Sequence, residues 1–412
     1  MNRIWNWFVK TRLGKSIFRV GYPKSTKDQS EAMTSSFLLH IQPAKVHKHA
    51  LKWNYSFGLG LITLYLFLIL IGTGILLMFY YIPSVKDAYN SMKDLQFIVS
   101  FGIVLRNLHR WAANLMVVFV ILHLCRVFYT GAYKSPREFN WVLGVFLLLV
   151  TFFLSFTGYL LPWDQLAFWA ITVGTNIAGY APILGSKIRY LLLGDDMVRQ
   201  SALLRFYVLH VVVLPAVALV LVFIHIWRVR KDGGLSRPSA KSPIKSETLN
   251  TQPGKTYALM ALVNGETPAT IQEPEEEVFS WPQLIFREIV LFLAVLAGLL
   301  ILSIFFNAPL EEIANPAHPT NPAKAPWYFL GLQELVSHSA LWGGVIVPTV
   351  IVLLLVFLPY IDRKPVGIGQ WFSKERWLAN TVFSILFITA VILTIIGTFF
   401  RGPNWSWVWP WK

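Results

Sequence analysis

Seven long apolar runs constrain this chain more than any other feature of its sequence. Each is close to the roughly 20 residues that a helix needs to cross the hydrocarbon core of a bilayer. The runs cover residues 56–82, 109–130, 139–161, 203–227, 284–306, 341–361 and 377–400. Only 14% of the 412 residues are charged, whereas a soluble domain carries about a quarter. The sequence therefore predicts an all-α integral membrane protein with about seven transmembrane helices.

The basic residues are concentrated beside these apolar runs. The net charge is +15, and ten Lys or Arg residues but only two acidic residues precede the first run. Basic residues in such positions bind anionic lipid and keep their side of the chain inside. We therefore expect membrane lipid and no nucleic acid as a partner. The same rule predicts an inside N-terminus and, after seven spans, an outside C-terminus.

Four segments of different composition follow one another along the chain. Residues 4–20 mix apolar side chains with Arg and Lys, which is typical of an interfacial amphipathic helix. The stretch after the fourth run is rich in Pro, Ser, Thr, Lys and Glu, which indicates an inside-facing linker. The long loop after the third run predicts short helices along the outer surface. The predicted segments are an N-terminal surface segment (1–55), a four-helix domain (56–230), the linker (231–280) and a three-helix domain (281–412).

Four histidines lie in or at the ends of two apolar runs, where ionisable residues are costly and need ligands or partners. His109 and His123 are 14 residues apart in the second run, and His210 and His225 are 15 apart in the fourth. Both separations are close to two heptads, so each helix carries its two imidazoles on one side, about 21 Å apart along the axis. Antiparallel pairing of the helices then places His109 level with His210 outside, and His123 level with His225 inside.

Two histidine pairs at opposite membrane depths fit two low-spin haems with both axial positions filled, which carry electrons rather than bind oxygen. The spacing therefore predicts electron transfer across the membrane. Zinc fits less well because neither pair has further Cys or carboxylate ligands nearby. The single cysteine, Cys125, allows no Cys-x-x-Cys-His haem attachment. A hydrogen-bonded packing role is the alternative for any one buried histidine.

Paired glycines in the neighbouring runs repeat the histidine spacing. Gly60 and Gly74 in the first run are 14 residues apart, as are Gly144 and Gly158 in the third. A haem wedged into a bundle needs helices without side chains where the macrocycle passes, whereas close helix packing is the alternative role. The shared spacing favours haem binding.

Charged residues near the ends of these helices are candidates for contacts with cofactors. Arg106, Arg110 and Arg126 flank the histidines of the second run and could pair with haem propionates; interfacial snorkelling is the alternative. Arg230 and Asp232 follow the fourth run and would provide a cation and a proton donor for a quinone at the inner surface. Ordinary positive-inside flanking is the alternative for Arg230.

Several motifs make the sequence resemble the cytochrome b subunit of the quinol:cytochrome c oxidoreductases, the bc complexes. In the front half they are the segments at 106–111, 123–131, 157–165 and 205–210. This half is similar to the chloroplast-type branch of the family. The back half resembles the separate three-helix subunit of the chloroplast-type complex through Pro-Trp-Tyr-Phe-Leu at 326–330. Here the two parts are joined by the linker.

The resemblance implies two b haems, one near each membrane face. His109 and His210 would hold the outer haem, and His123 and His225 the inner haem. Quinol would be oxidised outside and would give one electron to a Rieske iron–sulfur protein. The other electron would pass through the two haems to a quinone at the inner face, with net charge translocation. A c-type cytochrome or similar acceptor, a dimeric complex and a bacterial-type cytoplasmic membrane are the expected surroundings.

The resemblance also implies which residues line the quinol-oxidising pocket near the outer haem. Tyr159, Trp163 and Asp164 lie at the outer end of the third run. Trp327 and Tyr328 lie in the loop after the fifth run and would complete the pocket.

Two departures from the family limit what carries over. Pro326 stands where the family has the Glu of its Pro-Glu-Trp-Tyr motif, so another group must accept a proton from quinol. Asp164 and Glu334 are candidates if burial raises their pKa; water or another subunit is the third possibility. Alternatively, Asp164 caps the following helix and Glu334 pairs with a neighbouring helix. Gly58 stands where chloroplast-type members have the cysteine that tethers an extra haem, so we expect no covalent third haem.

Two other functions are compatible with buried histidines or charges in a membrane. The quinone-reducing cytochrome subunit of a hydrogenase or formate dehydrogenase also holds haem in a helix bundle. It does not predict the Pro-Trp-Asp-Gln end of the third run. A transporter also has buried charge but needs neither paired histidines nor matched glycines.

Overall fold

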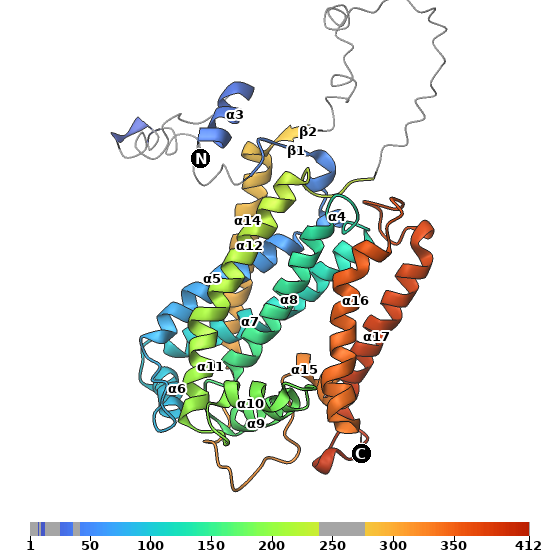
Figure 1. Ribbon diagram of the computed structural model, residues 1–412. Helices are drawn as coiled ribbons and strands as arrows, with labels where there is room; N and C mark the ends of the chain where they lie inside the picture. Colours follow the sequence, from blue (N-terminus) through green and yellow to red (C-terminus); the bar gives the residue numbers. More distant parts are fainter. Residues whose placement is uncertain (1–6, 8–9, 13–24, 36–41, 239–276, 412) are drawn as a thin grey trace, which may run out of the picture.

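The computed structural model describes residues 7, 10–12, 25–35, 42–238 and 277–411. Within these residues, seven helices are long and apolar enough to cross a bilayer, which confirms the prediction, and they lie side by side (Figure 1). They are α5 (Leu59–Met78), α7 (Gly102–Tyr129), α8 (Glu138–Tyr159), the continuous helix α11–η3–α12 (Gln200–Lys231), α14 (Ser280–Phe305), η5–α16 (Trp342–Ile361) and η6–α17 (Lys374–Phe399). Most of the predicted interfacial helix at 4–20 and the greater part of the linker lie outside the described residues.

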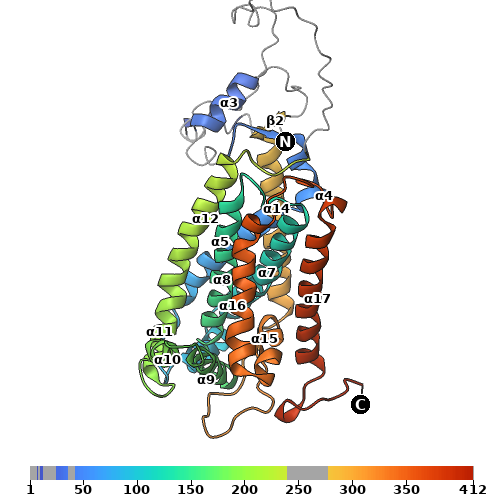
Figure 2. The same ribbon diagram turned by 45° about the vertical axis from the view of Figure 1, so that its right-hand side comes forward.

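The four front-half helices form a bundle that the back-half helices flank on two sides. Helix α7 packs against α5, and α8 packs against α12. Helix α14 packs on α7 and α5, whereas α16 packs on α8. Figure 1 shows α16 and α17 on one side of the bundle, and the turned view of Figure 2 shows α16 in front of the bundle with α17 to its right. The three transmembrane helices of the segment 281–412 therefore pack around the front-half bundle and do not form a separate bundle.

Helix α7 begins at Gly102, well before the predicted start at residue 109. The apolar pattern is interrupted by Arg106 and Asn107, yet both side chains are buried at 7% and 1% exposure. Arg106 donates to the Ala308 carbonyl in the loop that follows α14, and Asn107 Oδ1 accepts from Ala308 N–H. Tertiary hydrogen bonds thus extend a helix through polar residues that hydropathy alone excludes.

Short helices cover one end of the bundle, at the bottom of Figure 1. The prediction of such helices in the loop after α8 is confirmed by α9 (Gln165–Gly179) and α10 (Gly185–Leu193). Helices α6 (Ala88–Phe97) and α15 (Trp327–His338) lie at the same end. We call this the loop end. A core that includes Leu160, Trp163 and Phe206 fixes α6, α9 and α10 on the bundle.

A two-stranded ribbon covers the opposite end, which we call the ribbon end (Figure 1). Strand β1 (Lys45–His47) pairs antiparallel with β2 (Glu277–Phe279), with His47 opposite Glu277. The ribbon joins the segment before α5 to the start of α14, since Ser280 N–H donates to the Ala44 carbonyl. Helix α3 (Thr26–Ser35), η2 (Lys48–Leu51) and α4 (Trp53–Ser56) also lie before α5. The sequence analysis did not predict this ribbon.

One helix contains a widened turn at a histidine. Between α11 (Gln200–Val208) and α12 (Leu214–Lys231), the residues of η3 (Leu209–Val213) form a π-helical turn. Pro215 explains it, because a proline has no N–H to donate to the carbonyl four residues earlier. The turn contains His210, so its geometry sets the direction of that imidazole.

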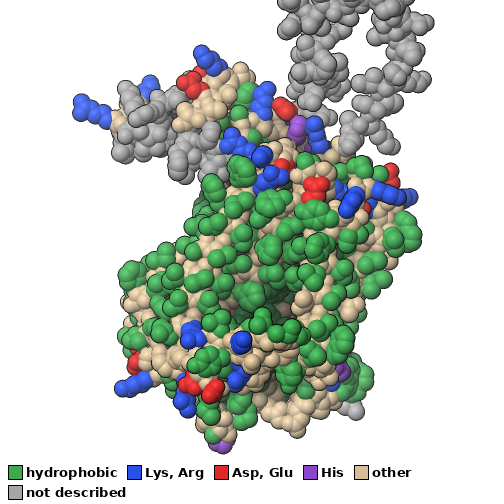
Figure 3. Space-filling model, viewed as in Figure 1, with side chains coloured by type: hydrophobic (Ala, Val, Ile, Leu, Met, Phe, Trp, Pro, Cys, Tyr) green, Lys and Arg blue, Asp and Glu red, His purple; other side chains and the backbone are tan. Residues whose placement is uncertain are grey.

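Polar side chains gather at the two ends of the molecule and apolar side chains cover its middle (Figure 3). At the ribbon end a buried ion pair joins the loop after α7 to the loop after α16. Lys134 Nζ lies 2.9 Å from Asp362, which also accepts from the Tyr133 hydroxyl. Arg376 donates to that hydroxyl at 2.8 Å. These satisfied charges fix the back half against the bundle.

Candidate functional site

The four histidines of the bundle face one another in two pairs. The ring centroids of His109 and His210 are 6.2 Å apart, and those of His123 and His225 are 6.4 Å apart. Helix α7 supplies one ring of each pair, and the η3–α12 helix supplies the other. The structure thus brings together the residues that the heptad spacing paired. The first pair lies toward the loop end and the second toward the ribbon end.

Each glycine lies against one of these imidazoles. A Cβ atom on Gly158 would come 2.5 Å from His210 Cε1, and one on Gly60 would come 3.1 Å from His123 Cε1. The corresponding distances are 3.3 Å from Gly74 to His109 and 3.7 Å from Gly144 to His225. The sequence analysis expected the glycines to make room for a macrocycle. In the structure they make room for the rings of the histidines themselves.

Threonine hydroxyls orient the loop-end pair. Thr73 Oγ1 lies 2.9 Å from His109 Nδ1, and Thr157 Oγ1 lies 3.2 Å from His210 Nδ1. A hydrogen bond at Nδ1 fixes the ring and leaves Nε2 as the ligating nitrogen. At the ribbon end, His123 Nδ1 is buried without a hydrogen-bond partner. The two pairs are therefore supported differently.

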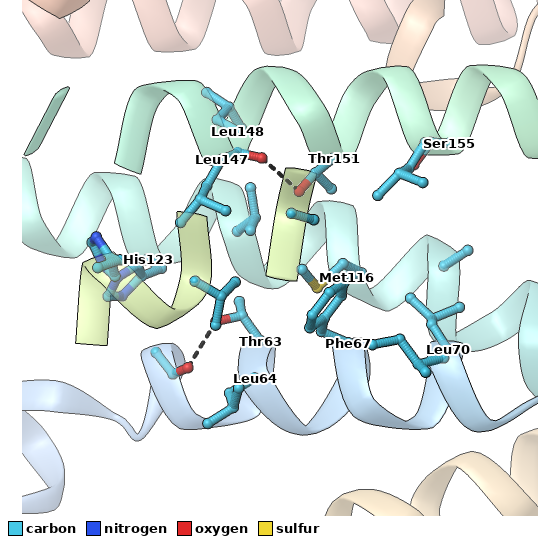
Figure 4. Close-up of a pocket in the computed structure, with 18 of the residues that line it drawn as sticks. Thr63, Leu64, Phe67, Leu70, Met116, His123, Leu147, Leu148, Thr151 and Ser155 are labelled. Carbon is cyan, nitrogen blue, oxygen red and sulfur yellow. Dashed lines mark hydrogen bonds between the residues drawn. The ribbon is translucent and has the colours of Figure 1, made fainter. Parts of the chain in front are cut away.

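Both histidine pairs border one internal cavity of about 1300 Å³. Figure 4 shows its middle part, where Phe67 of α5, Met116 of α7 and Leu147 of α8 enclose an apolar space. Thr63 and Thr151 also line it, but their hydroxyls donate to the carbonyls of Gly60 and Leu147. Because these polar groups are satisfied within their own helices, the space between the pairs is apolar.

The donor set fits haem better than a metal ion bound by protein alone. A bond from a metal to an imidazole nitrogen is about 2 Å, so two rings at this separation leave space for one ion between them. Within the described part of the chain, no group of three or more His, Cys, Asp and Glu residues could hold a metal. Two imidazoles therefore need a macrocycle to supply the other ligands. The shared cavity provides the volume for it.

The three arginines of α7 have different surroundings. Arg106 donates to the carbonyls of Ala308 and Pro309 at 2.9 and 2.6 Å, so its guanidinium anchors the loop after α14. Arg110 lies over the Tyr159 ring at 5.1 Å and borders the cavity. Arg126, at the ribbon end, borders the cavity with a buried Nη2 that has no hydrogen-bond partner. Arg126 also donates from Nε to the Tyr55 carbonyl at 3.4 Å, so its free Nη2 and the guanidinium of Arg110 are the groups available to a propionate.

Four of the residues predicted for the outer quinol pocket line the cavity, and the other three do not. Tyr159, Asp164, Pro326 and Tyr328 border the loop end of the cavity. Trp163 is instead buried in the core beneath α9, with left-handed backbone geometry at φ 54°. The Trp327 indole points to Asn114 and donates to its Oδ1 at 2.9 Å. Neither tryptophan therefore lines the pocket directly; each packs against the residues that surround it.

Asp164 caps α9, as the alternative interpretation of its position predicted. Its Oδ1 accepts from Ala167 N–H at 2.9 Å, and its Oδ2 accepts from Glu311 N–H at 3.2 Å. Burial nonetheless raises the pKa of this carboxyl above its ordinary value, while those hydrogen bonds and the nearby Arg110 and Arg106 oppose the shift. Asp164 is thus both a cap and a carboxylate on the cavity wall.

The prediction that burial raises the pKa of Glu334 is wrong. Both of its oxygens accept from Arg401, and Trp405 Nε1 donates to Oε2 at 2.9 Å. Burial alone would raise the pKa of Glu334, but these hydrogen bonds and the Arg401 charge hold it below its ordinary value. Glu334 is 2% exposed and is not among the residues that line the cavity. It anchors the C-terminal tail to α15.

Only one of the two residues predicted for the inner quinone site lines the cavity. Arg230 lines the cavity at the ribbon end. Asp232 is not among the cavity-lining residues, and its Oδ1 pairs with Arg228 at 3.0 Å. Arg228 and Asp232 are four residues apart, about one helical turn, so the sequence alone could have suggested this ion pair. Another carboxylate lines this end, that of Glu288 on α14, which the sequence analysis did not single out.

A seven-span helical protein with two pairs of facing buried imidazoles on the wall of one cavity belongs to the class of electron-carrying membrane cytochromes. Comparison with known families is specific. The family described as Cytochrome b/b6/petB matches residues 45–233, and the family described as Cytochrome b(C-terminal)/b6/petD matches residues 313–409. The chain therefore belongs to the cytochrome b family of bc-type complexes, with a b6-like front half and a subunit IV-like back half in one polypeptide.

Individual relatives agree with this assignment. Cytochrome b6 of Heliomicrobium gestii is 44% identical over 180 residues, which cover 44% of this chain and 84% of that protein. Cytochrome b6 of Emiliania huxleyi is 46% identical over the same shares of the two chains. A solved structure titled Hyperthermophilic respiratory Complex III matches with a TM-score of 0.69 and 27% identity, over 95% of this chain and 91% of that one. The family favours a bc-type cytochrome over a hydrogenase cytochrome or a transporter.

Proposed function

We propose that this chain is the diheme cytochrome b that oxidises quinol at the loop end and reduces quinone at the ribbon end. The observation that carries the proposal is the placement of two facing imidazole pairs at the two ends of one apolar cavity. An electron that enters at one histidine pair can therefore pass to the other pair within the protein, without crossing lipid. Membership in the cytochrome b family supports b-type haem as the cofactor.

In this proposal His109 and His210 hold one haem, and His123 and His225 hold the other. Haem b, when bound there, would supply reversible one-electron redox chemistry. The protein fixes the imidazoles through Thr73 and Thr157 at the loop end. The glycines keep the neighbouring helices close to the rings. The apolar wall between the pairs excludes water from the path.

The loop end has the groups that quinol oxidation requires. Tyr159, Pro326 and Tyr328 border the cavity there and form a wall of rings for a flat quinol head group. Asp164 lies on the same wall, and burial raises the pKa of its carboxyl, which makes it a better proton acceptor than an ordinary aspartate. Each of its oxygens accepts one backbone hydrogen bond and keeps capacity for a further one. We assign the role of proton acceptor to Asp164 rather than to Glu334.

The orientation in the membrane follows from the charge distribution. The ribbon end carries the basic residues Lys45, Lys48 and Lys52, so we place it inside a bacterial-type cytoplasmic membrane and the loop end outside. The segments 1–55, 56–230, 231–280 and 281–412 keep the roles assigned from the sequence. A Rieske iron–sulfur protein and a c-type cytochrome or similar acceptor would then meet the loop end of a dimeric complex. Labelling of Ser246→Cys in a Cys125→Ser background from the inside only is the expected result.

Proteoliposomes containing the purified complex test the function. Added quinol should reduce the b-type absorbance and acidify the side on which the loop end is exposed. The His109→Ala variant should abolish reduction from the loop end. The proposal fails if quinol reduces no b-type absorbance in a preparation whose haem content is normal.

A further inference from the structure

A half-buried carboxylate, that of Glu288, lies at the ribbon end of the cavity, and the proposed electron path does not use it. Glu288 belongs to α14, inside a helix apolar enough to cross a bilayer, and its carboxyl group lines the cavity. Gln42 Nε2 donates to Glu288 Oε1 at 2.9 Å. Among the described residues, no Lys, Arg or His forms an ion pair with Glu288. Acidic residues inside membrane spans are costly and mark proton or ion paths when they have no cation partner.

The position of Glu288 relative to the ribbon-end histidines follows from packing between α14 and α5. The Tyr65 hydroxyl of α5 donates to the Glu288 carbonyl at 3.0 Å. One turn further along α14, Leu291 Cδ2 is 2.7 Å from the Cβ position of Gly58. Gly58 is two residues before Gly60, which packs against His123. Glu288 therefore lies beside the ribbon-end pair and not at the midpoint of the bundle.

The ribbon supplies titratable groups between Glu288 and water. His47 of β1 and Glu277 of β2 are opposite one another, with His47 Nδ1 3.9 Å from Glu277 Oε1. Their side chains are 22% and 42% exposed, and both residues also line the cavity. Arg237 lies 3.0 Å from His47 Nδ1. The cavity therefore has, at this end, an outer pair in contact with solvent and one carboxylate inside.

We propose that Glu288 is the proton-relay residue for the quinone reduced at the ribbon end, and that the His47–Glu277 pair resupplies it from solvent. This inference rests on the proposed function. Reduction of one quinone consumes two electrons and two protons and yields one quinol. The electrons come from quinol oxidised at the loop end. Glu288 passes one proton to a quinone oxygen, is protonated again through the ribbon, and passes the second.

The neutral partner of Glu288 is consistent with a relay. Gln42 can donate to a carboxylate and can also accept from a carboxylic acid through its own amide oxygen. An arginine or lysine in that place would hold the group in its charged form, as Arg401 does for Glu334. The surroundings of Glu288 thus accommodate both protonation states, as a group that gains and loses a proton requires.

The test uses the purified complex, reduced beforehand under anaerobic conditions and mixed with a short-chain benzoquinone. The Glu288→Gln variant should slow reoxidation of the b-type absorbance by about tenfold, with the absorbance spectrum itself unchanged. The Glu288→Asp variant should keep most of the rate because it retains a carboxyl group. Glu138→Gln is the matched control, since Glu138 starts α8 and is not among the residues that line the cavity.

An infrared readout separates a relay from a structural role. The reduced-minus-oxidised difference spectrum should contain a carboxylic acid carbonyl band that is lost in Glu288→Gln and kept in Glu138→Gln. A Glu288→Gln variant with wild-type reoxidation and an unchanged carbonyl band would overturn the relay but leave the proposed function standing. If the wild-type complex contains both haems and yet no quinone reoxidises them at the ribbon end, the proposed function is wrong and the relay falls with it.

Discussion

The two ends of the bundle hold the same pair of ligands in opposite kinds of surroundings. At the loop end, backbone carbonyls and amides engage Arg106 and Asp164, and threonines engage both imidazoles. At the ribbon end, Arg126 Nη2 and His123 Nδ1 are buried without hydrogen-bond partners. At the loop end, hydrogen bonds within the protein fix the polar groups. At the ribbon end, some polar groups remain available to bind other molecules.

This difference matches the chemistry proposed at each end. Quinol oxidation requires a rigid wall and a place for the departing proton, and fixed dipoles provide rigidity. Quinone reduction requires protons from solvent, and the ribbon end combines solvent-exposed titratable groups with a half-buried carboxylate that lines the cavity. Variants that change only one end of the bundle can test this comparison.

The largest expected effect comes from one methyl group at a glycine. In Gly158→Ala the new Cβ would meet His210 Cε1 at 2.5 Å, and Thr157 and the π-helical turn limit any retreat of the ring. We expect loss of the loop-end haem from the redox titration and complete loss of quinol oxidation. Gly144→Ala is the matched control, because its Cβ would lie at an ordinary 3.7 Å from His225. Equal haem content in both variants would show that the ring packing does not govern binding.

A smaller effect is expected at Asp164. Because burial raises the pKa of this carboxyl, the wild-type rate of quinol oxidation should increase with pH as the group loses its proton and becomes able to accept one. Asp164→Asn keeps a capping oxygen for α9 but removes the acceptor. The rate should fall about tenfold, near 1.4 kcal/mol of barrier, and that increase with pH should disappear. A variant that keeps the wild-type pH profile would exclude Asp164, and both haem spectra should be unchanged.

The smallest effect on electron transfer is expected at Glu334, which lies away from the cavity. Its lowered pKa means that pairing with Arg401 stabilises the tail above the ordinary Glu value of 4.5. This contribution is lost as pH falls through the lowered pKa of the folded protein. Glu334→Gln should expose the tail to hydrogen exchange at neutral pH, as acid does in the wild type. Exchange that is equal in the two proteins at pH 7 would contradict the anchoring role.

Periodic features of the sequence predicted the site better than isolated residues did. The histidine and glycine spacings are properties of single helices, so the pairing could be derived before the fold was known. Contacts between distant segments could not. Arg401 is 67 residues from Glu334, and nothing near Glu334 indicates a guanidinium partner. Arg106 was expected to contact a cofactor, but the loop carbonyls about 200 positions later take its hydrogen bonds.

The sequence analysis missed the two-stranded ribbon for a related reason. The strands β1 and β2 are three residues each and form only because segments far apart in the chain meet. Glu288 could have been noticed as the carboxylate of an otherwise apolar run, but the cavity that gives it a role depends on how α14 packs on α5.

The central claim is that two facing histidine pairs hold two separate haems. Redox titration of the b-type absorbance in four single variants tests it most directly: His109→Ala, His210→Ala, His123→Ala and His225→Ala. The account predicts two components in the wild type, loss of one and the same component in the first two variants, and loss of the other component in the last two. Retention of both components in any variant, or loss of different components within a pair, would contradict it.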